Sequence, residues 1–295
     1  MGWMEAVAWY LAFAVAAYIM LAVVITVFQR RLIYKPDPRR TTPHRDGHYD
    51  VDELRIPTPD GKTIVAWYTM AVPGQPTVLY FHGNAGYIEL RNDRLTELKS
   101  RGYGVLMPNM RGYGGSSGRP CERSAVADAK LVHACLRNSG VAANDIIVFG
   151  ESLGTGIATQ LAASRNVAGL ILDSPYTSMT DLAVRAYPWL PVRRMLWDQF
   201  ETERHIKRVT VPILIIHGEA DRLVPVDMGR ALFDTAVAPK TLITFPGVSH
   251  LEHIPHGSFD DIERWIERVA TGDRTANPLS HLNPWQPIYT GGRTD

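Results

Sequence analysis

The sequence predicts an α/β fold with a mostly parallel sheet, and three observations lead to this prediction. Short apolar, β-branched runs alternate with longer stretches of helical period over most of the chain. Several short runs, such as 146–149 and 213–216, are continuously apolar, as expected for strands covered on both faces. A Gly-x-Ser-x-Gly pattern at 150–154 lies between one such run and a helical stretch. Strands that alternate with helices form βαβ units, in which the sheet is parallel.

Length and composition limit the function classes. The chain has 295 residues, of which 45% are hydrophobic and 21% charged, and its formal net charge is +1. This length is enough for one large α/β domain with a substantial core. A charge so close to zero gives no indication of a nucleic-acid partner. Cys121 and Cys135 form no metal or redox pattern, and the ten histidines are scattered, so no metal or organic cofactor is expected.

Residues 6–28 contain no charged side chain. As a helix rising about 1.5 Å per residue, this run is about 34 Å long, which is enough to cross a hydrocarbon core of about 30 Å. A cleavable signal peptide has a basic start and a shorter apolar region, and a buried core helix is usually amphipathic. We therefore predict a single-pass membrane anchor over residues 1–28.

A basic linker is predicted over residues 29–50. No Lys or Arg precedes the apolar run, whereas the linker contains Arg30, Arg31, Lys35, Arg39, Arg40 and Arg45. The positive-inside rule then places the N-terminus outside and the following domain in the cytoplasm, where the cysteines stay reduced. The same charges suit contact with anionic lipid headgroups, although setting the topology would alone explain them.

The soluble domain is predicted over residues 51–270. Strands are expected at 51–56, 63–69, 77–81, 103–108, 145–149, 168–172, 211–216 and 241–245. Helical period is found at 88–101, 123–138, 153–164, 227–237 and 258–270. The first two strands have no helix between them, and Asp60-Gly61 forms a hairpin turn. An eight-stranded sheet with an antiparallel start and flanking helices is therefore expected.

Two segments do not fit the alternation. Residues 174–207 are rich in aromatic residues and proline, and an insertion at the carboxyl side of the strands is a natural lid or pocket wall. The alternative is ordinary connecting helices whose aromatic side chains belong to the core. The tail, residues 271–295, is rich in Thr, Pro, Gly and Asn without a period, and we expect it to be loosely ordered.

Ser152 is the predicted nucleophile. It lies in Gly150-Glu151-Ser152-Leu153-Gly154, between a strand and a helix, which is the context that a nucleophile elbow requires. The serine occupies a sharp, strained turn that lifts its hydroxyl clear of the sheet. Glycines two residues away on either side let the neighbouring backbone pass where a Cβ would clash. The helix that begins just beyond favours negative charge near its N-terminus.

A serine hydroxyl needs a base, and the base needs an orienting carboxylate. In elbow-containing enzymes these follow in the order Asp or Glu, then His, after late strands. Asp221 follows the strand at 211–216, and His250 follows the strand at 241–245. His253 and His256 remain alternatives for the base. The alternatives for the acid are Asp173, Glu219 and Asp227.

An acyl-transfer enzyme also needs hydrogen-bond donors for the oxyanion. One is expected to be the backbone N–H of Leu153, the residue after the nucleophile. The other is expected to be the backbone N–H of Asn84, in the small-residue loop 82–86 after the third strand.

Together these motifs resemble the α/β-hydrolase family, in particular its small-lid, membrane-anchored esterase branch with depalmitoylase-like and bud-emergence-related hydrolases. The resemblance covers about residues 50–270. It implies a Ser152–Asp221–His250 triad with Asn84 and Leu153 as oxyanion donors. The family usually carries an Asp where this chain has Asn109, a difference that concerns loop packing more than catalysis. The motifs are YFHGNAG at 80–86, NMRGYGGSSGRP at 109–120, GESLG at 150–154, HGEADRLVP at 217–225 and PGVSH at 246–250.

The predicted activity is hydrolysis of carboxylic esters or thioesters through an acyl-enzyme. The anchor and the aromatic insertion favour an acyl-chain or lipid-like ester, or an acylated protein, as substrate. A serine peptidase of the same fold is an alternative, and a non-catalytic, membrane-tethered binding scaffold is another. Degenerate relatives usually lose a triad residue, whereas this sequence keeps candidates for all three. The sequence leaves the oligomeric state open.

Overall fold

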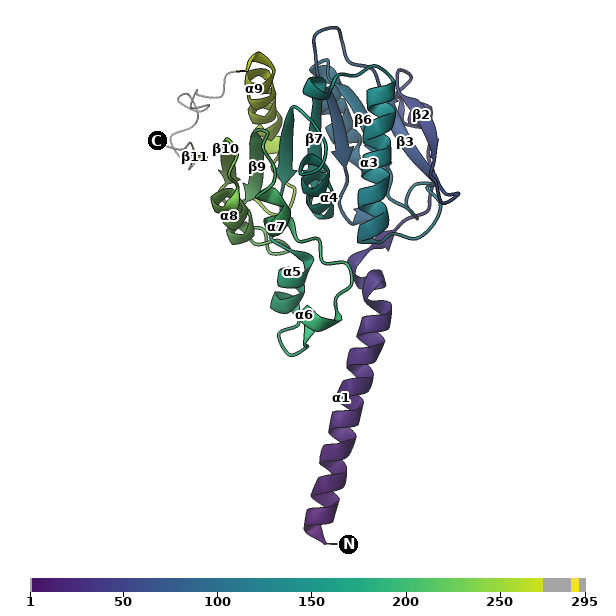
Figure 1. The fold of residues 1–295 in the computed structure, drawn as a ribbon, viewed down its shortest axis with the longest axis vertical. Coiled ribbons are helices and arrows are strands. Elements are labelled where there is room, and N and C mark those ends of the chain that lie inside the picture. The colour runs from purple at the N-terminus through teal and green to yellow at the C-terminus, as the bar shows by residue number, and fades with distance from the viewer. Residues whose placement is uncertain (1, 273–287, 292–295) are drawn as a thin grey trace.

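The computed structural model describes residues 2–272 and 288–291. An α/β domain lies at one end of a long N-terminal helix (Figure 1). The helices are α1 (Trp3–Ile33), α2 (Asn92–Ser100), α3 (Glu122–Asn138), α4 (Leu153–Ala162), α5 (Met179–Ala186), α6 (Val192–Met195), α7 (Thr202–Ile206), α8 (Val226–Thr235) and α9 (Ser258–Thr271). The strands are β1 (Lys35–Pro36), β2 (Asp52–Pro57), β3 (Thr63–Thr69), β4 (Thr77–Phe81), β5 (Ala85–Gly86), β6 (Gly104–Pro108), β7 (Ile146–Glu151), β8 (Gly169–Asp173), β9 (Ile213–Gly218), β10 (Lys240–Phe245) and β11 (Ile288–Gly291).

The main sheet has the strand order β11-β10-β9-β8-β7-β4-β6-β3-β2 in the described residues. Strands β4 and β6 to β10 are parallel, whereas β2 pairs antiparallel with β3, and β3 pairs antiparallel with β6. The eight expected strands and the antiparallel start are thus confirmed. Because β4 lies between β6 and β7, the chain reverses its direction of travel across the sheet beside β4, where ligand sites of such sheets occur.

A ninth strand, β11, was not expected. It belongs to the tail that the sequence predicts to be loosely ordered, and it pairs antiparallel with β10. Without it, β10 would be an edge strand with unpaired backbone groups, which gives a physical reason for the pairing. The rest of that tail, residues 273–287 and 292–295, lies outside the described residues.

The central strands are buried on both faces because helices cover both sides of the sheet. Within β7, Ile146 and Val148 belong to one apolar core, and Ile147 and Phe149 belong to the other. Helices α3, α4 and α8 pack on the first face, and α2 and α9 pack on the second. This two-sided cover explains why these strands read as continuous apolar runs rather than as alternating ones.

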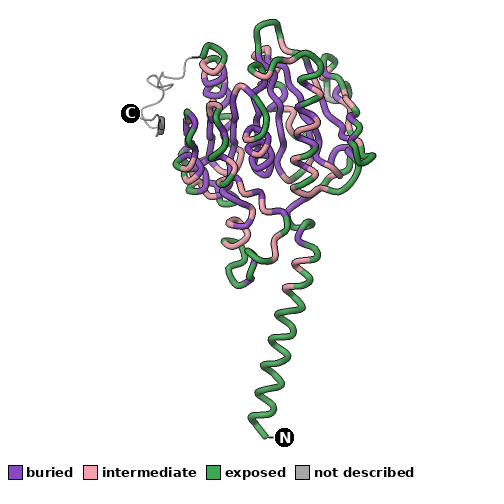
Figure 2. The backbone as a smooth tube through the Cα atoms, in the orientation of Figure 1, coloured by how far each residue is buried: buried purple, intermediate pink, exposed green. Residues whose placement is uncertain are grey.

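Helix α1 is long and apolar enough to cross a membrane. Figure 2 shows it exposed along most of its length, in contrast to the buried strands of the domain. It continues to Ile33, beyond residue 28 where the apolar run ends, and it buries only Gln29 and Ile33. Of the predicted lid segment, α5 and α6 extend from the domain on the side from which α1 emerges (Figure 1). Helix α7 instead packs against α4 and α8 in the body of the domain.

Candidate active site

Ser152 lies at a strained turn between β7 and α4. Its φ is +49°, a left-handed value that is costly for a residue with a side chain, and its N–H donates to the carbonyl of Asp173 at 2.9 Å. A Cβ on Gly154 would come within 2.1 Å of the Phe81 carbonyl oxygen, and one on Gly150 within 2.6 Å of the Gly154 carbonyl oxygen. Both glycines are therefore required by close backbone packing around the serine.

His250 bridges Ser152 and Asp221. Its Nε2 lies 3.0 Å from the Ser152 hydroxyl oxygen, and its Nδ1 lies 2.6 Å from a carboxylate oxygen of Asp221. The three side chains come from the turn after β7 and from the segments that follow β9 and β10. All three are therefore brought together at the carboxyl end of the parallel strands, in the arrangement expected from the sequence.

The Asp221 carboxylate is held in its charged form. Burial opposes the charge, but hydrogen bonds from His217, His250 and the Val224 N–H outweigh burial and hold the pKa of Asp221 well below its usual range. The Asp221 oxygen that faces away from His250 also accepts from the N–H of Leu223 at 2.9 Å. A carboxylate fixed in this way orients the His250 ring.

The alternative residues are engaged elsewhere. His253 and Asp173, alternatives for base and acid, bind each other at 2.7 Å in a buried pair that excludes both from the Ser152 hydroxyl. His256 is exposed in a short 3-10 turn. Glu219 binds Arg230 and Thr244, and Asp227 pairs with Arg185.

The two predicted oxyanion donors flank the elbow. Within the described residues, neither the Asn84 N–H nor the Leu153 N–H donates a hydrogen bond to another protein group. The Asn84 carbonyl accepts from the Tyr113 hydroxyl at 2.8 Å and from the Lys35 N–H at 3.2 Å. Its side-chain amide donates to the Ile33 carbonyl at 3.0 Å. The loop is thus tied to the end of α1 and to β1, which pairs with β5.

The buried ring of His82 supports the loop 82–86 through hydrogen bonds on both of its nitrogens. Burial lowers the pKa of His82 to about 4, so its ring is neutral at physiological pH. The ring accepts from the Met110 N–H at 3.1 Å and lies 2.7 Å from the Gly83 carbonyl, to which the other nitrogen donates. Asn109 accepts from the Ile88 N–H and donates to the Gly114 carbonyl. A carboxylate at that position has no N–H to donate, so Asn109 suits the packing of this loop.

Glu151, beside the nucleophile, is the centre of a buried charge cluster that the sequence did not reveal. Its carboxylate accepts from the Tyr80 hydroxyl at 2.5 Å and from the Gly83 N–H at 3.2 Å. It pairs with Arg91 at 2.7 Å and with Arg94 at 2.9 Å. Burial opposes its charge, but the two guanidinium groups outweigh burial and lower its pKa to about 2.

Within the described residues, no cluster of three or more His, Cys, Asp or Glu side chains has a geometry suited to a metal ion. The chemistry that the site supports is acyl transfer by a serine hydroxyl next to a histidine and a carboxylate. Strand order, elbow and side-chain contacts together define a hydrolase of the α/β-hydrolase fold.

Comparisons with known proteins place the chain more closely. The family model described as alpha/beta hydrolase fold matches residues 76–200, and the model described as Serine aminopeptidase, S33, matches residues 192–254. An uncharacterized protein of Mycobacterium tuberculosis is 36% identical over 246 residues, which cover 80% of this chain and 86% of that protein. The chain belongs to the α/β-hydrolase family.

Two further similarities are informative. A lysophosphatidylserine lipase of Danio rerio is 32% identical over 198 residues, which cover 60% of this chain but about half, 51%, of the lipase. An esterase of Pyrococcus furiosus has the same fold, with a TM-score of 0.66 over 80% of this chain and 98% of the esterase, at 18% identity.

We predict that Glu151→Gln destabilises the fold by about 3–5 kcal/mol, because it leaves Arg91 without its buried counter-charge and Arg94 with only the half-exposed Asp93 as a partner. Urea unfolding of the detergent-solubilised protein at pH 7 measures the change. Glu201, which is partly exposed and paired with Arg204, is the matched control, and Glu201→Gln should change the free energy of unfolding by less than about 1 kcal/mol.

The same variant carries a pH signature. The pKa of Glu151 falls from about 4.5 to about 2 on folding, so its charge contributes stability that is fully present above pH 4.5. That contribution is lost as the pH falls from 4.5 toward 2. The difference between wild type and Glu151→Gln should therefore shrink over this window, and a constant difference would contradict the charge cluster as its cause.

Proposed function

We propose that this chain is a serine hydrolase that cleaves carboxylic esters or thioesters, with Ser152, His250 and Asp221 as its catalytic triad. The observation that carries the proposal is the continuous contact from the Ser152 hydroxyl through His250 to Asp221, at a strained turn between a strand and a helix. The relative described as a lysophosphatidylserine lipase supports hydrolysis as the reaction class, and the esterase structure supports the fold.

In the proposed mechanism, His250 Nε2 takes the proton of the Ser152 hydroxyl as the oxygen attacks the substrate carbonyl. Asp221 stabilises the resulting imidazolium, and the N–H groups of Asn84 and Leu153 donate to the oxyanion. His250 then gives its proton to the leaving alcohol or thiol. Water, deprotonated by His250, attacks the acyl-enzyme and releases the carboxylic acid and the free serine.

The proposed substrate carries an acyl chain. Helix α1 is apolar enough to hold the domain at a bilayer, and the segment between β8 and β9 exposes Tyr187, Trp189 and Trp197 beside it. Exposed aromatic side chains of this kind favour membrane interfaces. The relative described as a lysophosphatidylserine lipase cleaves a lipid ester, which supports the same class here. An acylated protein is a second form that such a substrate takes.

We further propose a single-pass membrane protein whose catalytic domain faces the cytoplasm. The charges that follow the apolar run are basic, and no basic residue precedes it. The positive-inside rule then sets the orientation.

A serine peptidase is the second candidate, because the family model described as Serine aminopeptidase, S33, matches residues 192–254. Amide and ester cleavage use the same triad and differ in the leaving group. Comparing an aminoacyl anilide with an acyl ester of matched leaving group distinguishes them. A kcat/KM for the anilide that equals or exceeds that for the ester would favour the peptidase.

We predict that a fluorophosphonate probe labels the wild-type protein at Ser152, and that Ser152→Ala loses the label and the hydrolytic activity. Mass spectrometry of the labelled peptide identifies the modified residue. Ser164 is exposed two residues after the end of α4, and Ser164→Ala should be labelled like wild type. Full hydrolytic activity in Ser152→Ala would disprove the assignment of the nucleophile.

The base is tested by a matched pair of histidines. His250→Ala should lower kcat/KM by about 10²–10⁴-fold or more, because general-base catalysis is lost. His253→Ala removes a ring that contacts Asp173 instead of Ser152, so the probe should still label the folded protein at Ser152. A loss of labelling with His253→Ala alone would show that the base had been assigned to the wrong histidine.

The acyl-chain proposal predicts that kcat/KM rises from acetyl to octanoyl esters of one phenol. Each methylene that the site removes from water contributes about 0.8 kcal/mol, so two such groups raise kcat/KM by about 15-fold. Initial rates at substrate concentrations below the critical micelle concentration measure the trend. A preference for the acetyl ester would count against an acyl-chain substrate while leaving the triad unaffected.

A further inference from the structure

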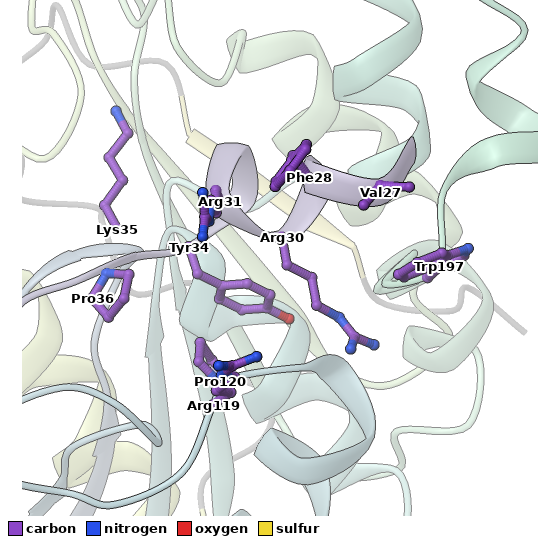
Figure 3. A pocket seen from close by; sticks show the side chains of 10 residues that line it. All are labelled: Val27, Phe28, Arg30, Arg31, Tyr34, Lys35, Pro36, Arg119, Pro120 and Trp197. Carbon is purple, nitrogen blue, oxygen red and sulfur yellow. The ribbon is translucent and has the colours of Figure 1, made fainter. Parts of the chain in front are cut away.

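A cavity of about 710 Å³ lies where α1 meets the domain (Figure 3). Four cationic side chains line it, from the end of α1, from β1 and from the segment before α3: Arg30, Arg31, Lys35 and Arg119. Phe28 and Trp197 form apolar parts of its wall. The cavity thus combines positive charge with aromatic surface, and it lies outside the Ser152 site.

Most of this positive charge has no counter-charge. Arg30 forms a two-point ion pair with Asp198 and stacks over the Trp197 ring at 5.5 Å. In the part of the chain that the structure describes, Arg31, Lys35 and Arg119 form no ion pair with a carboxylate. Three exposed cations therefore line one cavity that has no carboxylate among its lining residues, and the Asp198 carboxylate is already paired with Arg30.

The position of the cavity along α1 sets its depth relative to a bilayer. The apolar run of α1 ends at Phe28, which lines the cavity, and the cations begin two residues later, at Arg30. If α1 crosses the bilayer, this boundary is the level of the lipid headgroups. The cationic part of the cavity then faces phosphate groups, and its apolar part faces the upper acyl chains.

The segment beside α1 supports the same depth. The Tyr18 hydroxyl donates to the Trp189 carbonyl at 2.8 Å, so the link between α5 and α6 lies against the apolar run itself. Tyr18 is about 15 Å along the helix axis from Phe28. Residues 187–191 carry no charge and expose Tyr187 and Trp189. An uncharged aromatic tip at this level fits a location inside the bilayer, with the cavity at its surface.

We propose that this cavity binds one anionic phospholipid, with the phosphate held by Arg31, Lys35 and Arg119 and the start of the acyl chains against Phe28 and Trp197. Guanidinium groups match phosphate oxygens with paired N–H donors, and lysine adds a compact positive charge. Each basic side chain near an anionic membrane surface strengthens binding about fivefold.

Backbone contacts connect the cavity to the loop beside Ser152. The N–H of Lys35, the first residue of β1, donates to the Asn84 carbonyl, and β1 pairs with β5 just beyond Asn84. The binding proposal goes beyond the proposed hydrolysis and does not depend on the Ser152 mechanism, because none of the lining residues belongs to the triad.

The test uses the full chain in nanodiscs of phosphatidylcholine with a minor fraction of phosphatidylglycerol, and native mass spectrometry counts the lipids retained after ejection. Wild type should retain one phosphatidylglycerol in preference to phosphatidylcholine. The double variant Lys35→Gln/Arg119→Gln should weaken this preference by about 25-fold, because two basic charges are removed. Fluorophosphonate labelling of the same samples reports separately whether the site at Ser152 is intact.

A matched control removes two exposed arginines that do not line the cavity, in Arg45→Gln/Arg165→Gln. Its preference should equal that of wild type, and an equal loss in both variants would overturn the proposal in favour of diffuse surface charge. Inorganic phosphate at millimolar concentration should not displace the lipid. Full displacement would show a site for free phosphate instead, and unchanged retention in Lys35→Gln/Arg119→Gln would disprove the cavity as the binding site.

Discussion

The carboxylate of Glu151 is fully buried, and the geometry around the nucleophile depends on the groups that hold it. On its own strand it precedes Ser152, and across the sheet it accepts from the Gly83 N–H, one residue before the proposed oxyanion donor Asn84. Arg94, which pairs with it, also donates to the carbonyl of Leu251, the residue after His250. One buried charge therefore connects the elbow, the oxyanion loop and the histidine loop.

Burying the three charged groups Glu151, Arg91 and Arg94 is costly, and this cluster offsets the cost only because each carboxylate oxygen has several donors. Such an arrangement tolerates little displacement, which suits a site whose reacting atoms must be held within fractions of an ångström.

Much of the fold was predictable because its signals are local. Continuous apolar runs marked the strands, and the flanking glycines of the elbow marked a turn that only a close backbone approach demands. The Ser152–His250–Asp221 grouping was also expected from chain order and position after strands. Glu151 was not predictable as a structural centre, because its position in the elbow pattern admits any residue, and no local signal marks Arg91 and Arg94 as its partners. The pairing of His253 with Asp173 lay beyond sequence reasoning for a similar reason, since contact between residues 80 positions apart has no local signal. Strand β11 also had no local signal, because its pairing depends on the exposed edge of β10 rather than on its own four residues.

The end of α1 is a structural part of the domain as well as the end of a helix that could span a membrane, and Gln29 shows why. A tether needs only length and apolar surface, and a polar amide beside a bilayer is costly unless it is bonded. The Gln29 amide is buried, with its nitrogen donating to the Met195 carbonyl and its oxygen accepting from the Trp197 N–H. These two bonds fix the rotation of α1 about its own axis relative to the segment that follows α6. One turn further on, the Ile33 carbonyl accepts from Asn84. A helix held at both points cannot swing freely, so in the proposed membrane-spanning arrangement the orientation of α1 in the bilayer would also set that of the loop beside Ser152. For the proposed acyl-chain substrate, the direction of approach to Ser152 would then be set by the fold itself, rather than by chance collisions of a flexibly tethered domain.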